Sequence, residues 1–275
     1  MTPGGRAVSR VTETEVRPGQ GPGHRVRVVI KPGDWEQTDP FLALMEDWFT
    51  PGTFGPHPHR GFETVTYILE GELRHRDNHG GEGVLEAGDA QLMTAGRGIV
   101  HEEEPISTEV HSLQLWLNLP SSLKMTEPRY QDLRSASMPL RLEDGADVRV
   151  FSGHSGDAAA STLNHVPFTM LDLKLGQGAN IPQDSSPRET VFIYVIDGAL
   201  VLGSNAVRVD AGHVAWFDAD SGESPGVTIT AAADTHAVYF GARPLREPVV
   251  ASGPFVMNTA EEIRQAFADF RSGKF

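Results

Sequence analysis

The sequence contains no cysteine, and this absence excludes two kinds of structure. With 275 residues and Cys 0, the chain has neither disulfide bridges nor thiolate ligands for a metal. Any bound metal must therefore be held by histidine and carboxylate side chains. A chain without disulfides fits a reducing compartment, and we expect a cytoplasmic protein.

Positive charge and long apolar runs are also scarce. Lys+Arg 23 against Asp+Glu 37 gives a formal net charge of −14, which opposes binding to nucleic acid or to an anionic membrane. No run approaches the roughly 20 apolar residues of a membrane-spanning helix, and residues 1–20 lack the apolar segment of a signal peptide. We therefore expect no direct nucleic-acid partner and no membrane association. No zipper pattern is present, so a monomer is expected.

Glycine and proline are abundant, at Gly 29 and Pro 19, and this composition favours strands and turns over a helical bundle. Residues 64–69 are β-branched and aromatic, and residues 72–77 return after a Glu-Gly turn, as in a hairpin. Similar short segments continue to residue 117, which indicates an antiparallel sandwich or barrel. By periodicity, residues 41–49 fit either a strand or a short helix. We favour a strand because the segment leads directly into a Pro-His turn.

Histidine is concentrated in two short motifs, one before the first hairpin and one in a later strand. Side chains alternate across a strand, so His57 and His59 share one face of their strand, and the same parity puts His101 and Glu103 together on theirs. Three imidazoles and one carboxylate suit a divalent first-row metal such as iron, nickel, copper or zinc. We predict one metal held by His57, His59, His101 and Glu103.

The strand-rich pattern occurs twice. Residues 63–71 resemble residues 189–198, in which Glu-Thr-Val is again followed by tyrosine, two apolar residues, an acidic residue and glycine. In neither register does the second copy have histidines at the positions of the His57 and His59 pair. We predict an all-β fold of two tandem antiparallel barrels. Residues 1–135 would form the metal-binding barrel, and residues 136–275 a degenerate barrel with a C-terminal helix.

The helix is expected from a capping box and an apolar stripe near the end of the chain. Thr259 and Glu262 are spaced as in a capping box, and Gly273 is placed to end the helix. The apolar residues Ile263, Ala266 and Phe267 recur at helical spacing. We expect this stripe to pack on a barrel wall.

Three motifs resemble the pirin family of the cupin superfamily. They are residues 56–65 (Pro-His-Pro-His-Arg-Gly-Phe-Glu-Thr-Val), residues 93–101 (Met-Thr-Ala-Gly-Arg-Gly-Ile-Val-His) and residues 253–259 (Gly-Pro-Phe-Val-Met-Asn-Thr). The resemblance runs from about residue 41 to residue 275. It implies a bicupin with a single Fe(II) ion in the N-terminal barrel, at the four ligand positions named above.

The resemblance also implies two classes of function. The first is an oxidoreductase like quercetin 2,3-dioxygenase, which cleaves a flavonol with O2 and releases carbon monoxide. In this reading Glu103 is the catalytic base, and a small aromatic substrate and O2 are the partners. The second is a non-enzymatic, iron-dependent redox sensor that binds a transcription factor or a metabolic enzyme. We favour the enzyme.

Other polar residues receive secondary roles. Glu63 follows the histidine pair, and we expect it to support or rim the site. His24 and His75 lie outside the two motifs and are expected to be structural.

Overall fold

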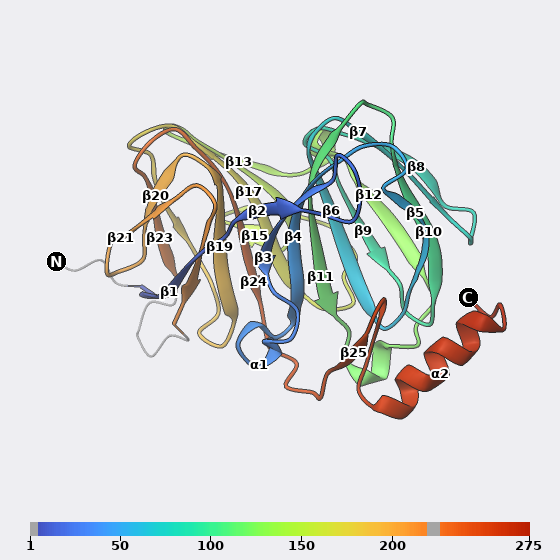
Figure 1. The fold of residues 1–275 in the computed structure, drawn as a ribbon. Coiled ribbons are helices and arrows are strands. Elements are labelled where there is room, and N and C mark those ends of the chain that lie inside the picture. The colour runs from blue at the N-terminus through green and yellow to red at the C-terminus, as the bar shows by residue number, and fades with distance from the viewer. Residues whose placement is uncertain (1–4, 219–225) are drawn as a thin grey trace. The chain divides into compact units, whose positions relative to one another are not determined.

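The computed structural model describes residues 5–218 and 226–275. The chain forms two compact units, each built almost entirely of antiparallel strands (Figure 1). The expected all-β fold of two barrels with a C-terminal helix is therefore confirmed. Within the described ranges, no helix has the length and apolar character needed to cross a membrane.

The first barrel is made from two sheets. The seven-stranded sheet has the order β12 (Arg129–Leu133), β9 (Ala90–Thr94), β6 (Phe62–Glu70), β11 (Val110–Asn118), β4 (Phe41–Phe49), β3 (Arg25–Ile30) and β2 (Val16–Pro18). The four-stranded sheet has the order β5 (Phe54–His59), β10 (Ile99–Pro105), β7 (Glu72–Asp77) and β8 (Glu82–Glu86). The short helices of this region are α1 (Trp35–Thr38) and the 3₁₀ turn η1 (Ser121–Leu123), and a second 3₁₀ turn, η2 (Ser135–Ser137), spans the boundary between the units.

The interior of the first barrel is only partly apolar. Ile68 of the large sheet packs with Leu73 and Leu85 of the small sheet in one buried cluster, which joins the two sheets through their inner faces. Several other buried positions in the barrel are polar, among them His59, His101 and Glu103. Buried polar groups need hydrogen-bond or metal partners, so this part of the interior is the place to look for chemistry.

The second barrel has the same plan. Its larger sheet has the order β1 (Val8–Glu13), β22 (His213–Phe217), β19 (Thr190–Asp197), β24 (Thr235–Ala242), β17 (Phe168–Leu175), β14 (Ala146–Ser152) and β13 (Leu140–Glu143). Its smaller sheet has the order β18 (Asn180–Gln183), β23 (Val227–Ala231), β20 (Ala199–Leu202) and β21 (Val207–Asp210), and a hairpin is formed by β15 (His154–Ser155) and β16 (Ala158–Ala159).

Apolar side chains fill the second barrel. Leu171 and Ile193 of its larger sheet share one buried cluster with Leu200 and Ile229 of its smaller sheet. This continuous packing stabilises the fold by removing apolar surface from water. The second barrel is therefore built as a packed core, in contrast to the partly polar first barrel.

The units divide between residues 135 and 136 as expected, but each end of the chain belongs to the opposite unit from the one expected. Strand β1 pairs with β22 and so belongs to the second barrel. Residues 245–275 belong to the first unit, where they form β25 (Val250–Ser252), β26 (Phe255–Met257) and α2 (Ala260–Arg271). The physical reason is long-range pairing at both ends, which local sequence patterns do not encode.

The predicted capping box of α2 is present. The Thr259 hydroxyl accepts a hydrogen bond from the Glu262 backbone N–H, and the Glu262 carboxylate accepts one from the Thr259 N–H. Ile263 and Ala266 are buried with Phe255 and Met257 of β26. The apolar stripe thus holds the helix against the C-terminal hairpin of the first unit.

Candidate metal centre

The three motif histidines come from two paired strands of the first barrel. Strands β5 and β10 are antiparallel, with His57 opposite His101. Strand alternation turns His59 to the same side as His57, and the ring centroids of these two residues are 4.8 Å apart. The His101 ring centroid lies 4.3 Å from that of His57 and 5.0 Å from that of His59. One nitrogen from each ring lies within 4.8 Å of the other two.

The hydrogen bonding of these imidazoles leaves nitrogen atoms available. His57 Nδ1 lies 2.8 Å from the Gly55 carbonyl oxygen and must donate to it, which leaves Nε2 with its lone pair. His59 Nδ1 and His101 Nε2 are buried and have no hydrogen-bond partner within residues 5–218 and 226–275. An unpaired buried polar atom costs roughly 1–3 kcal/mol. Coordination of a metal ion would satisfy both atoms, so the residues present fit a metal.

Electrostatics keep two of the rings neutral. Burial lowers the pKa of His59 to about 3, and the neighbouring His57 adds to the effect. Burial and the surrounding histidines also lower the pKa of His101 well below its usual value. Neutral imidazole is the form that ligates metals. The site therefore does not have to release protons from these two rings to take up a cation near neutral pH.

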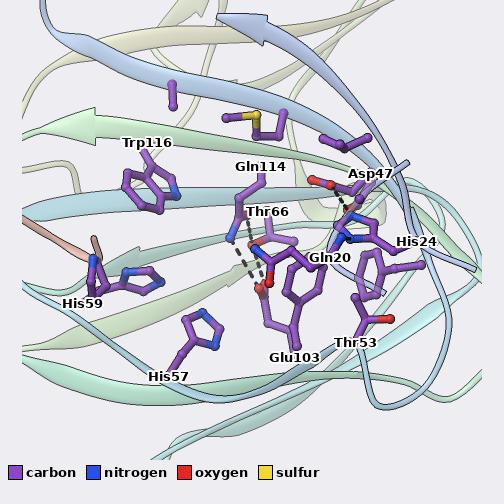
Figure 2. Close-up of a pocket in the computed structure, with 18 of the residues that line it drawn as sticks. Gln20, His24, Asp47, Thr53, His57, His59, Thr66, Glu103, Gln114 and Trp116 are labelled. Carbon is purple, nitrogen blue, oxygen red and sulfur yellow. Dashed lines mark hydrogen bonds and ion pairs between the residues drawn. The ribbon is translucent and has the colours of Figure 1, made fainter. Parts of the chain in front are cut away.

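Glu103 lies in the same interior, and its carboxylate is held by two neighbours (Figure 2). The Thr66 hydroxyl lies 3.0 Å from Glu103 Oε1 and 2.6 Å from Gln114 Oε1, and its single proton can serve only one of them at a time. The Gln114 amide donates to Glu103 Oε2 over 3.4 Å. The cluster of potential ligands in the described chain contains only the three histidines, so ligation by Glu103 stays a prediction.

His75 is a fourth histidine that the motifs do not reveal. Its ring is buried, and its Nδ1 atom lies 3.4 Å from His101 Nδ1. On its other side, Nε2 lies 3.5 Å from an Asp77 carboxylate oxygen. The sequence does carry a clue, because alternation from the buried Leu73 turns position 75 inward.

The turn after β5 is fixed by two buried contacts. Arg60 is buried, and its guanidinium donates to the Asp269 carboxylate at 2.9 Å. Gly61 has φ 90°, a conformation that glycine adopts without strain. Its carbonyl accepts a hydrogen bond from the Lys124 ammonium at 2.8 Å. Glu63, expected to support or rim the site, is fully buried and accepts a hydrogen bond from Thr94.

A cavity of about 670 Å³ opens beside the histidines. Its walls follow the two-residue period of the strands, because inward-facing residues of β3, β4, β5 and β11 line it. They are Val26, Val28, Ala43, Met45, Asp47, Phe49, His57, His59, Gln114 and Trp116. The volume and the apolar walls are typical of a site for a small organic molecule.

Comparison with known proteins identifies the family. The Pirin family model matches residues 28–117, and the model of the Pirin C-terminal cupin domain matches residues 170–275. The chain is 44% identical to Pirin of Homo sapiens over 260 residues, covering 93% of this chain and 89% of that protein. It is 40% identical to Pirin-1 of Arabidopsis thaliana over 261 residues, covering 93% and 90%.

A solved structure has the same fold. The quercetin 2,3-dioxygenase from Acinetobacter baumannii is 33% identical and superposes with a TM-score of 0.88, covering 99% of each chain. The two-barrel fold, the histidine cluster and the sequence matches agree, and the chain belongs to the pirin family of bicupin proteins.

Proposed function

We propose that this protein is a metal-dependent dioxygenase that cleaves flavonols such as quercetin, with Fe(II) as its metal. The observation that carries the proposal is the convergence of three histidines at a cavity with largely apolar walls. The similarity to a quercetin 2,3-dioxygenase across 99% of the chain supports the same reaction. Ring cleavage would consume O2 and release carbon monoxide.

His57, His59 and His101 would hold the metal, with Glu103 as the fourth ligand. When bound, such an ion supplies a Lewis acid and a centre for dioxygen chemistry. The flat walls around Trp116 and Phe54 would orient an aromatic substrate and exclude water. The substrate would present its neighbouring hydroxyl and keto oxygens to the histidine end of the cavity.

Glu103 would accept the proton of the substrate hydroxyl. Its carboxylate is buried, and Thr66 and Gln114 fix its position. The 3.4 Å contact between Gln114 Nε2 and Oε2 is long for a hydrogen bond, and Oε1 shares the Thr66 proton with Gln114 Oε1. Neither carboxylate oxygen is therefore fully committed to the protein. Either oxygen is available to accept the proton.

The test is aerobic turnover of quercetin by iron-loaded protein, followed by loss of flavonol absorbance and by carbon monoxide release. Glu103→Gln should lower kcat about 100-fold or more, because a positioned general base contributes roughly 10²- to 10⁴-fold. Glu104→Gln is the matched control, since Glu104 is the next residue and alternation turns it to the other face of β10. The proposal fails if the wild type does not consume quercetin with any of iron, nickel, manganese or copper, or if Glu103→Gln is as active as the control.

A further inference from the structure

The cavity has a second polar end that the proposed reaction does not use. His24 and Asp47 lie across the cavity from His57 and His59, with Glu103 between them (Figure 2). Both side chains of the pair are more than nine-tenths buried, at 4% and 9% exposure. Asp47 lies on the inward face of β4 between Met45 and Phe49. Its neighbours on this face are apolar, so a carboxylate is unusual at this position.

The hydrogen bonds of the pair define which atoms are available. The Gln20 backbone N–H donates to His24 Nδ1 at 2.8 Å, so the ring proton is on Nε2. Nε2–H then donates to Asp47 Oδ1 at 2.8 Å. Asp47 Oδ2 has no hydrogen-bond partner among the residues that the structure describes. A carboxylate oxygen on a buried side chain that lines a cavity, with no donor of its own, is positioned to accept a hydrogen bond from a ligand.

Aromatic contacts connect this end of the cavity to the histidine end. The Phe54 ring meets the His24 ring edge-on, with centroids 5.2 Å apart. Phe54 belongs to β5, the strand that carries His57 and His59, and it lies opposite Glu103 in the sheet register. One flat, apolar wall therefore runs between the two polar ends.

We propose that the His24 and Asp47 pair is a specificity subsite that binds a phenolic hydroxyl at the end of the substrate remote from the histidine cluster. The inference rests on the proposed function, because it assumes that the other end of the ligand lies at the three histidines. The ligand class is a planar aromatic with a chelating oxygen pair at one end and a hydroxyl at the other. Asp47 Oδ2 accepts the hydrogen bond, and His24 positions the carboxylate.

A purely structural role for the pair makes a different prediction. His24 also holds the turn at residues 19–24, where the Gly19 N–H donates to the His24 carbonyl oxygen. If the pair only stabilised this turn, loss of Asp47 would weaken all ligands equally. A subsite instead discriminates between ligands with and without the remote hydroxyl.

The experiment compares two probes, quercetin and 3-hydroxyflavone. The first carries ring hydroxyls remote from the chelating oxygens, and the second has none. Affinities are measured without oxygen on iron-loaded, full-length protein by calorimetry, and turnover is measured separately in air. The wild type should bind quercetin at least about tenfold more tightly, the effect of one hydrogen bond to a charged group.

Asp47→Asn should reduce the affinity for quercetin about tenfold and leave 3-hydroxyflavone within about twofold. Glu46→Gln is the control on the same strand, because Glu46 pairs with Arg27 and His111 and does not line the cavity. The comparison of the two probes on the wild type needs no variant, so it tests the subsite even if Asp47→Asn does not fold.

The outcomes separate this inference from the proposed function. The subsite is overturned, even if flavonols are cleaved, by either of two results. The first is equal wild-type affinity for quercetin and 3-hydroxyflavone, and the second is an equal loss of affinity for both probes in Asp47→Asn. Hydroxyl-dependent binding that needs Asp47, without turnover in air, supports the subsite and overturns the dioxygenase. The subsite is also overturned if neither probe binds.

Discussion

The Nδ1 atoms of His75 and His101 lie 3.4 Å apart in the interior of the first barrel. This contact places a buried histidine behind one of the three histidines of the candidate metal centre. Groups that hold a ligating histidine in orientation commonly change metal affinity by 10- to 100-fold when they are removed. We therefore expect His75 to position the His101 ring.

Replacement of His75 by phenylalanine should weaken metal binding about tenfold. The ring volume is kept, but the hydrogen-bonding partner of His101 is lost. His79→Phe is the control, since His79 is exposed at the tip of the same hairpin. Titration of the metal-free proteins with Fe(II) or Ni(II) measures the effect. Equal affinities in the two variants would contradict the positioning role.

Asp269 gives a pH dependence with a definite sign. Hydrogen bonds from Arg60, Gln265 and Lys274 lower the pKa of Asp269 to about 2, below the ordinary value of 3.8. The lowered value means that the folded state favours the ionised carboxylate, so its contribution to stability is complete above about pH 4. That contribution is lost as the pH falls toward about 2.

Thermal melts of the wild type and Asp269→Asn between pH 6 and pH 2 test this contribution. The variant should melt at a lower temperature at pH 6, because the neutral amide pairs less well with the Arg60 guanidinium. This difference in melting temperature should disappear as Asp269 becomes protonated in the wild type. A difference in melting temperature that stays constant down to pH 2 would show that the charge of Asp269 does not contribute to stability.

The strand pattern and the histidine motifs were sufficient to predict the barrels and the histidine cluster. Strand parity placed His57 and His59 on one face because that rule is local. The burial of Asp47 was not predicted, since its partner His24 lies just before β3 and only their contact shows why a carboxylate is buried on β4. The helix α2 was predicted from its capping box, but it was expected in the second barrel and belongs to the first unit. The bridge between Arg60 and Phe255 that ties its segment to β5 joins residues far apart in sequence.

Gly61 should be intolerant of a side chain. A Cβ atom at this position would collide with the Val256 carbonyl oxygen, and the residue also has φ 90°. Gly61→Ala should therefore destabilise the fold by more than about 3 kcal/mol, from steric overlap and backbone strain together.

Gly52 separates these two effects. It has φ 84°, and a Cβ atom there would meet nothing within 4 Å. Gly52→Ala should cost only about 1–2 kcal/mol, the strain of the left-handed conformation alone. Chemical denaturation of the two variants measures the difference. If Gly61→Ala cost no more than Gly52→Ala, close packing of β26 against the turn after His59 would be disproved.

The most direct test of the metal centre is an anomalous difference map, collected at the iron absorption edge from crystals grown with Fe(II). We predict one strong peak in the first barrel, within coordination distance of imidazole nitrogens from His57, His59 and His101. This peak should be absent from crystals of a His59→Ala and His101→Ala double variant. A map with no peak at these three residues, or with the ion bound in the second barrel, would contradict a metal centre at this cluster.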